Sequence, residues 1–177
     1  QGIGIGVILS LAMIIFRTTR PHVAELGKVP NSHFYRNLDR FDQLEDRADL
    51  LIFRFDAQLY FANCNYFRES LESYITRKDK RLKTIILCFN SINNLDSSAM
   101  HMLEELAEDY KNQGIALLFT GVKGPLRDAM EKAHFIEKVG ENNFFMGIQQ
   151  AVDFIDNNQS EFSSKKSINY ILQTNEE

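Results

Sequence analysis

The sequence contains few of the residues from which active sites are usually built. Among its 177 residues it has only two cysteines and four histidines. Cys64 and Cys88 lie far apart, in no metal-binding or redox spacing, so we expect reduced structural thiols. The histidines fall in separate predicted elements without the spacing of metal ligands, and no metal site is therefore predicted: His22, His33, His101 and His134.

Other signatures of chemistry are also missing. There is no Gly-x-x-x-x-Gly-Lys-Ser/Thr phosphate loop, and no nucleophile stands in a recognisable arrangement with a base. The net charge is −4, and no basic stripe with interleaved aromatic residues is present. These absences argue against an enzyme, a cofactor and nucleic-acid binding.

What the sequence does contain is an uninterrupted apolar run at its beginning. Ile3 to Phe16 includes no charged residue and one hydroxyl, Ser10. As a helix this run would cover about 21 Å at a rise of about 1.5 Å per residue, whereas a bilayer core measures about 30 Å. We therefore interpret residues 1–16 as the C-terminal part of a transmembrane helix whose upstream part is missing.

Small residues recur every four positions along this run, at Gly2, Gly6 and Ser10. Such spacing lets membrane helices approach one another closely, so these positions are predicted to pack against another helix. A signal peptide is disfavoured because the charged residues follow the apolar run instead of preceding it. A dinucleotide-binding loop is disfavoured because no strand is predicted before the glycines.

Basic residues follow the apolar run directly. Arg17, Arg20 and Lys28 lie just beyond it, which by the positive-inside bias predicts that this end of the helix faces the cytoplasm. Pro21, Gly27 and Pro30 oppose a continuing helix. Residues 17–33 are therefore predicted to be a linker.

The next segment, 34–157, has the pattern of one α/β domain, and the polar residues 158–177 are predicted to be a disordered tail. Continuous apolar runs predict buried strands, and apolar residues at helical spacing predict helices. The predicted strands are 34–38, 50–55, 59–61 paired with 50–55, 84–89, 115–120 and 143–146. The predicted helices are 65–77, 96–113, 124–133 and 148–155. Because a strand, a helix and a strand follow one another over 84–120, a parallel crossover is expected there.

Two turns are candidates for a binding or regulatory site. Asp96 is predicted to cap the helix after the strand 84–89, with Ser97 and Ser98 in the positive field of its N-terminus, where an anion is stabilised. The simpler interpretation is that these residues serve only as helix caps. Lys123 lies in a strand-to-helix turn that could contact an anion through its backbone N–H groups, although an ordinary turn explains the same residues.

Several of these segments resemble a known family. The resemblance is carried by residues 17–30 (Arg-Thr-Thr-Arg-Pro-His-Val-Ala-Glu-Leu-Gly-Lys-Val-Pro), Tyr35-Arg36-Asn37, residues 53–63 (Phe-Arg-Phe-Asp-Ala-Gln-Leu-Tyr-Phe-Ala-Asn) and Leu95-Asp96-Ser97-Ser98-Ala99. Together they are similar to the C-terminal end of SulP-family anion transporters, where the last membrane helix leads through a short linker into a STAS domain (sulfate transporter and anti-sigma factor antagonist).

The resemblance implies an α/β fold with a mixed β-sheet of about five strands and helices packed on it, preceded by the end of a transmembrane helix. It implies that the full protein moves sulfate, bicarbonate, chloride or a related anion by symport or exchange. The STAS domain is then a regulatory and interaction module on the cytoplasmic side of the membrane. Its expected partners are a cytosolic protein or a nucleotide, and the full transporter could form a homodimer.

An alternative is a stand-alone switch protein. In free-standing anti-sigma factor antagonists the serine after the aspartate of this loop is phosphorylated, and it corresponds to Ser97 here. Such a protein would have no use for the apolar run Ile3 to Phe16.

Overall fold

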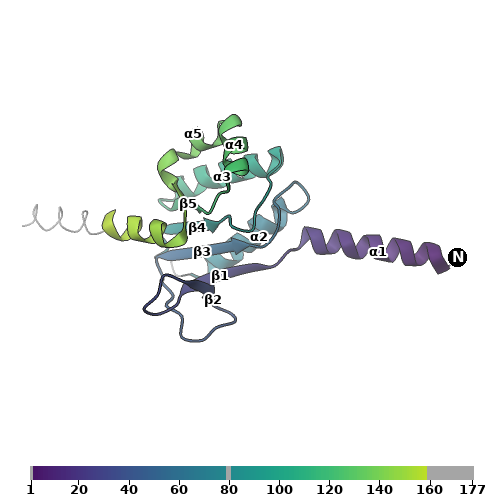
Figure 1. Cartoon of the computed structure of the whole chain (residues 1–177), viewed down its shortest axis with the longest axis horizontal. Coiled ribbons are helices and arrows are strands. Elements are labelled where there is room, and N and C mark those ends of the chain that lie inside the picture. The colour runs from purple at the N-terminus through teal and green to yellow at the C-terminus, as the bar shows by residue number, and fades with distance from the viewer. Residues whose placement is uncertain (1, 79–80, 159–177) are drawn as a thin grey trace, which may run out of the picture.

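The protein is built around one mixed sheet. A computed structural model of the chain describes residues 2–78 and 81–158 (Figure 1). The sheet has six strands in the order β2-β1-β3-β4-β5-β6. The strands are β1 (Val23–Lys28), β2 (Tyr35–Asn37), β3 (Leu50–Phe55), β4 (Thr84–Cys88), β5 (Ala116–Thr120) and β6 (Phe144–Phe145). β1 is antiparallel to both of its neighbours, whereas β3 to β6 are parallel. The predicted mixed α/β class is confirmed, with six strands where about five were expected.

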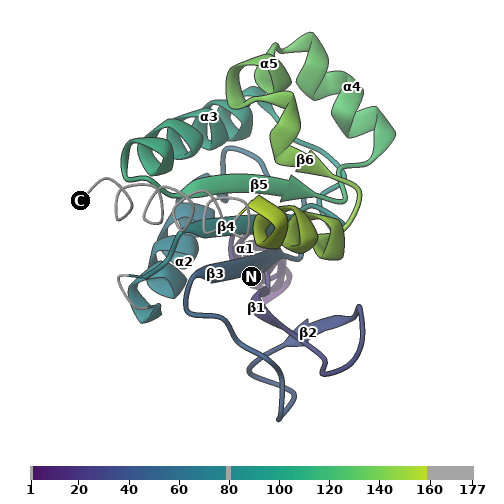
Figure 2. The ribbon, with the colours of Figure 1, turned by 90° about the vertical axis from the view of Figure 1, so that its left-hand side faces the viewer.

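Helices cover both faces of this sheet (Figure 2). The face with the larger apolar cluster carries four helices: α2 (Cys64–Arg77), α3 (Ser97–Asn112), α4 (Gly124–Lys132) and α5 (Phe135–Val139). A short 3-10 helix, η1 (Glu141–Asn143), leads into β6. The opposite face is covered by the helical residues 148–158, drawn in yellow-green. The predicted helix 148–155 is therefore confirmed and extends to residue 158. The rest of the predicted tail, 159–177, lies outside the described residues.

The strand sequences divide the core between the two faces. In β3, Leu51 and Phe53 belong to the cluster under α2 to α5, whereas Leu50 and Ile52 belong to the cluster under residues 148–158. Side chains alternate between faces because the side-chain period of a strand is two residues. All five residues of β4 are buried, as predicted for a strand that is covered on both faces.

The predicted linker is corrected by the structure. Within residues 17–33, the segment Val23–Lys28 forms β1, which lies between β2 and β3 in the sheet. The sheet thus begins before residue 34, where the domain was predicted to start. Pro21 and Pro30 flank the strand without interrupting it. Gly27 is needed for packing, because a Cβ at this position would lie 2.5 Å from Leu38 Cδ2.

A charged residue within β1 obscured this strand in the sequence. The side chain of Glu25 is largely buried, with its carboxylate Oε1 2.6 Å from Nζ of Lys78, which follows α2. Lys78 also pairs with Asp46 in the loop between β2 and β3. Burial raises the pKa of Glu25 above its usual value, against the opposing effect of Lys78. The ion pair therefore fastens the end of α2 to the antiparallel side of the sheet.

A second correction concerns residues 59–61, which do not pair with β3. Leu59 forms an isolated bridge with Leu95, and the residues after it turn into α2. The turn is closed by Asn63, whose Oδ1 accepts a hydrogen bond from Tyr60 N and whose Nδ2 donates to Gln58 O. This side-chain bonding replaces the backbone pairing that a hairpin would have made.

The apolar run forms the helix α1 (Gly2–Thr19), which extends away from the sheet (Figure 1). Its large apolar side chains are all at least half exposed and lie on every side of the helix: Ile3, Ile5, Val7, Ile8, Leu9, Leu11, Met13, Ile14, Ile15 and Phe16. Within residues 2–78 and 81–158, no helix is both long enough and apolar enough to cross a membrane.

Candidate functional site

The predicted site lies at the edge of the sheet where β3, β4 and β5 end. Asp96 is the N-cap of α3, as predicted, and its Oδ1 accepts a hydrogen bond from Ala99 N at 2.8 Å. The second carboxylate oxygen accepts a hydrogen bond from Phe61 N, also at 2.8 Å. Asp96 therefore joins the start of α3 to residues 56–63, the loop that follows β3.

Ser97 and Ser98 occupy the first turn of α3, and both are exposed. Within the described part of the chain, neither hydroxyl has a hydrogen-bond partner. Because free N–H groups at a helix N-terminus favour negative charge nearby, this turn can stabilise an anion carried on or close to either hydroxyl.

Lys123 lies in the loop between β5 and α4, and its ammonium group hydrogen-bonds to Oδ1 of Asn93 in the loop before α3. The two loops are neighbours because β4 and β5 are adjacent parallel strands. Gly121 permits this approach, since its φ is +70° and a Cβ there would overlap the Asn90 side chain. The structure thus brings Lys123 to the loop that leads into Asp96, the N-cap of α3.

Sequence reasoning missed a polar cluster at this same edge, centred on Asp56. His22 Nδ1 lies 2.9 Å from Asp56 Oδ2, and Arg54 Nε lies 2.8 Å from Asp56 Oδ1. Ser91, in the loop after β4, donates a hydrogen bond of 3.2 Å to Asp56 Oδ1. Burial alone would raise the pKa of Asp56, but the hydrogen bonds from His22, Arg54 and Ser91 hold it below its usual value.

The end of α1 is fastened to this cluster. Asn63 is fully buried, and its Nδ2 lies 3.5 Å from Thr18 O in the last turn of α1 as well as 2.9 Å from Gln58 O. The backbone of Asp56 donates a hydrogen bond of 3.0 Å to His22 O. We call Thr18, His22, Asp56 and Asn63 the helix–sheet joint. The register of β1 against β3 pairs Val23 with Phe55 and so places His22 beside Asp56. This pairing is tertiary and has no local signal in the sequence.

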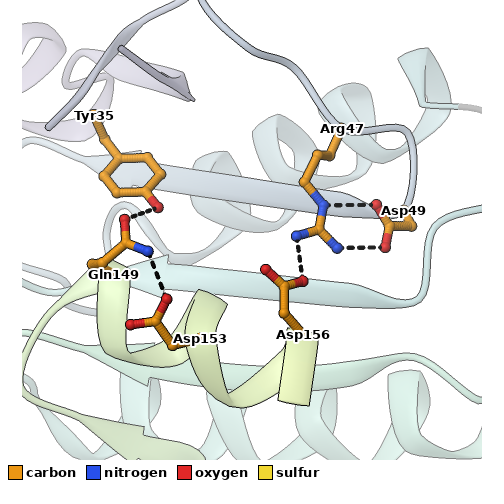
Figure 3. A network of polar contacts seen from close by, with 6 residues as sticks. All are labelled: Tyr35, Arg47, Asp49, Gln149, Asp153 and Asp156. Carbon is orange, nitrogen blue, oxygen red and sulfur yellow. Dashed lines mark hydrogen bonds and ion pairs between the residues drawn. The ribbon is translucent and has the colours of Figure 1, made fainter. Parts of the chain in front are cut away.

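The opposite face of the sheet carries a polar network that holds the helical residues 148–158 in place (Figure 3). Tyr35 Oη donates to Gln149 Oε1 at 2.9 Å, and Gln149 Nε2 donates to Asp153 Oδ1 at 2.7 Å. Burial, assisted by the negative charge of Asp153, raises the pKa of Tyr35 to about 12. The phenol therefore remains a hydrogen-bond donor at neutral pH.

The second half of the network is built on Arg47. Its guanidinium group binds both carboxylate oxygens of Asp49 and reaches Asp156 Oδ1 at 2.7 Å. Beside it lies a cavity of about 150 Å³ with an apolar floor that includes Leu26 and Val152. Because both partners of Arg47 are acidic and already bound, this network serves to attach the helix to the sheet.

The remaining reactive groups are not assembled into a site. Cys64 and Cys88 are free and buried, and burial raises the pKa of each thiol. In the part of the chain that the structure describes, no three His, Cys, Asp or Glu side chains are grouped to hold a metal ion.

The sheet order, the helices on its two faces and the loop that opens α3 define a small α/β domain whose polar edge lies where the parallel strands end. Comparison with known families identifies it: residues 43–151 match the STAS domain, and the chain belongs to this family. The resemblance seen in the sequence is thereby confirmed.

Individual relatives of the chain give more detail than the family match does. The chain is 32% identical over 160 residues to the probable sulfate transporter 4.2 of Arabidopsis thaliana, covering 85% of this chain and 24% of that protein. Among solved structures, it is similar to the murine Solute Carrier 26 family member A9 anion transporter, with a TM-score of 0.77, 22% identity, and coverage of 86% of this chain and 25% of that one. A sulfate transporter family protein from Wolinella succinogenes gives a TM-score of 0.55 and 24% identity, over 67% of this chain and 94% of that one. The chain thus spans about a quarter of the length of the sulfate transporter that it matches.

Proposed function

We propose that this chain is the C-terminal portion of a SulP-type membrane anion transporter, which moves sulfate, bicarbonate, chloride or a related anion by symport or exchange. Its STAS domain then acts as a cytoplasmic regulatory and interaction module. The observation that carries the proposal is the likeness to a sulfate transporter over 85% of the chain, a longer stretch than the STAS match over residues 43–151.

The surface of α1 supports a membrane location. A helix that is apolar on all sides needs an apolar environment around it, and the exposed side chains of α1 have none within the described residues. We therefore assign α1 to the cytoplasmic end of the last transmembrane helix, followed by Arg17 and Arg20 at the membrane surface.

We also propose that Gly2, Gly6 and Ser10 form a surface on which another membrane helix packs. A Cβ at Gly6 would meet no other atom within 4 Å, so this part of α1 is open to a neighbour. The Ser10 hydroxyl donates to Gly6 O at 2.9 Å and so needs no polar partner from outside the helix. Small, satisfied side chains of this kind permit close helix approach.

The regulatory surface that we propose consists of Asp96, Ser97, Ser98 and Lys123, with a cytosolic protein or a nucleotide as its partner. Ser97 and Ser98 contribute exposed hydroxyls, and Asp96 holds the turn on which they stand. Titration of the ¹⁵N-labelled chain with phosphate or a nucleotide would test the ligand-binding version. Absence of a chemical-shift change at these residues would remove it.

The proposal as a whole is tested by the native size and location of the protein. An antibody raised against residues 31–157 would be used to blot membrane and soluble fractions of the source cells. We expect a band several times heavier than 20.5 kDa that resists alkaline extraction of the membranes. A band near 20.5 kDa in the soluble fraction would contradict the transporter and favour the stand-alone switch, with phosphorylation of Ser97 as the next test.

A further inference from the structure

We propose that the end of the domain around Phe61 rests on the anionic headgroup layer of the membrane. This inference rests on the proposed function, because it requires α1 to enter a bilayer. It adds a second contact with the membrane, made by the folded domain itself through an aromatic side chain and the basic residues beside it.

The position of Phe61 is the first part of the argument. Its side chain is 73% exposed, although it is large and apolar. Its backbone is nevertheless fixed, because Phe61 N donates to Asp96 Oδ2 and the following Asn63 reaches Thr18 O in the last turn of α1. An exposed aromatic ring on an anchored backbone therefore stands next to the point where α1 leaves the domain.

The charges around this loop are the second part. Arg17, Arg20 and Lys123 are all exposed, and all lie on the elements that meet at this edge. Two acidic residues at this edge oppose them only in part. Asp56 is paired with His22 and Arg54, and Asp96, held by two backbone N–H groups, contributes one negative charge against three positive ones. The edge therefore presents positive charge, which anionic lipid headgroups attract.

The combination favours lipid as the partner of this surface. An exposed Phe ring can enter the apolar boundary just beneath the headgroups, as Phe, Trp and Leu side chains do in interfacial segments. Basic residues gather on the cytoplasmic side of a membrane helix. Here both features lie at the same end of one apolar helix. A contact between Phe61 and the protein of the transport domain is the competing outcome.

The chain contains no tryptophan, so a single introduced indole reports on one position without background. We would compare Phe61→Trp with Phe34→Trp, a matched control that is 70% exposed. Phe34 follows the turn after β1, at the end of that strand opposite α1. A third variant, Ile8→Trp, places the indole on the apolar surface of α1 and reports whether that helix inserts.

Each variant of the full chain would be reconstituted into phosphatidylcholine vesicles with and without phosphatidylserine, some of them carrying brominated acyl chains. We expect the F61W emission to shift to shorter wavelength and to be quenched by brominated lipid, more strongly when phosphatidylserine is present. The F34W emission should stay at the wavelength of an exposed indole. Far-UV circular dichroism would verify that the three variants keep the same fold.

The controls separate failure of this inference from failure of the proposed function. If I8W is quenched but F61W behaves like F34W, α1 inserts and the contact of Phe61 with lipid is refuted. If I8W is not quenched, membrane insertion fails and this inference fails with it. Protection of F61W from aqueous iodide in the full-length transporter, without quenching by lipid, would instead identify a protein contact and overturn the inference.

Discussion

Replacement of Asp96 by alanine tests whether this residue is chiefly a structural connector between α3 and the loop after β3. Losing an N-cap side chain costs about 1 kcal/mol, within a range of about 0.5–2 kcal/mol. The hydrogen bond from Phe61 N to the same carboxylate involves a charged acceptor, and such bonds contribute about 1.5–3 kcal/mol, less where water competes. Because water competes for this bond in the partly exposed loop, we take about 1 kcal/mol for it, below that range. The expected loss in the free energy of unfolding is about 2 kcal/mol.

Two further variants divide this loss between its sources. Asp96→Ser keeps an oxygen that can cap α3 through Ala99 N but is too short to reach Phe61 N as well, so about half of the loss should remain. Ser98→Ala removes an exposed hydroxyl that has no partner among the described residues, and it should change stability by less than about 0.5 kcal/mol. This variant is the matched control, because it alters the same helical turn.

The assay is urea unfolding of the full chain in a mild non-ionic detergent, followed by far-UV circular dichroism. With a urea m-value of about 2 kcal/mol/M, a loss of about 2 kcal/mol lowers the midpoint by about 1 M. The m-value itself should not change. A midpoint for D96A equal to that of S98A would refute the connecting role and leave Asp96 free for ligand binding.

Two other predictions concern ionised groups. Lys78→Met should lower the free energy of unfolding by about 3 kcal/mol, because it leaves the Glu25 carboxylate largely buried without its partner at 2.6 Å. In urea unfolding, adding Glu25→Leu to this variant should restore part of the loss. If the losses of the two single variants simply add in the double variant, the ion pair does not have this role. The lowered pKa of Asp56 should contribute stability in full above its unfolded value of 3.8 and lose that contribution as the pH falls below 3.8. In acid denaturation, Asp56→Asn should therefore flatten the fall in the free energy of unfolding below pH 3.8, and His22→Ala should make that fall smaller than in the unsubstituted protein. An unchanged profile for His22→Ala would show that the pair with His22 is too weak to matter.

The parallel half of the fold could be predicted from the sequence because its signals are local. Strands β4 and β5 are continuous apolar runs, and α3 between them has an apolar face, an aspartate N-cap and Gly114 directly after its C-cap Gln113. Gly114 has a φ of +74°, which glycine adopts without strain. Once β4 and β5 are neighbours, the approach of Lys123 to the loop before α3 follows from topology alone.

The antiparallel half could not be predicted in the same way, because what stabilises it is distant in the sequence. Glu25 argues against a buried strand until Lys78 is known to lie beside it. The loop that contains Phe61 is expected to be a hairpin strand, since the apolar residues 59–61 follow a short turn after β3. Nothing local reveals that Asn63 closes the turn. Both errors come from side chains that act through a tertiary partner.

The candidate site likewise combines residues with a local sequence signal and contacts that only the tertiary structure reveals. Its residues could be proposed because Asp and Ser at a helix start form a local pattern. Its connection to α1 could not, because residues 17–33 are expected from the sequence to form a linker. The helix–sheet joint replaces a flexible connection with hydrogen bonds from Asn63 and Asp56 to the backbone of Thr18 and His22. Asn63 belongs to the same loop that Asp96 holds at Phe61 N. A displacement of α1 relative to the sheet would therefore act on the loop that Asp96 connects to the first turn of α3.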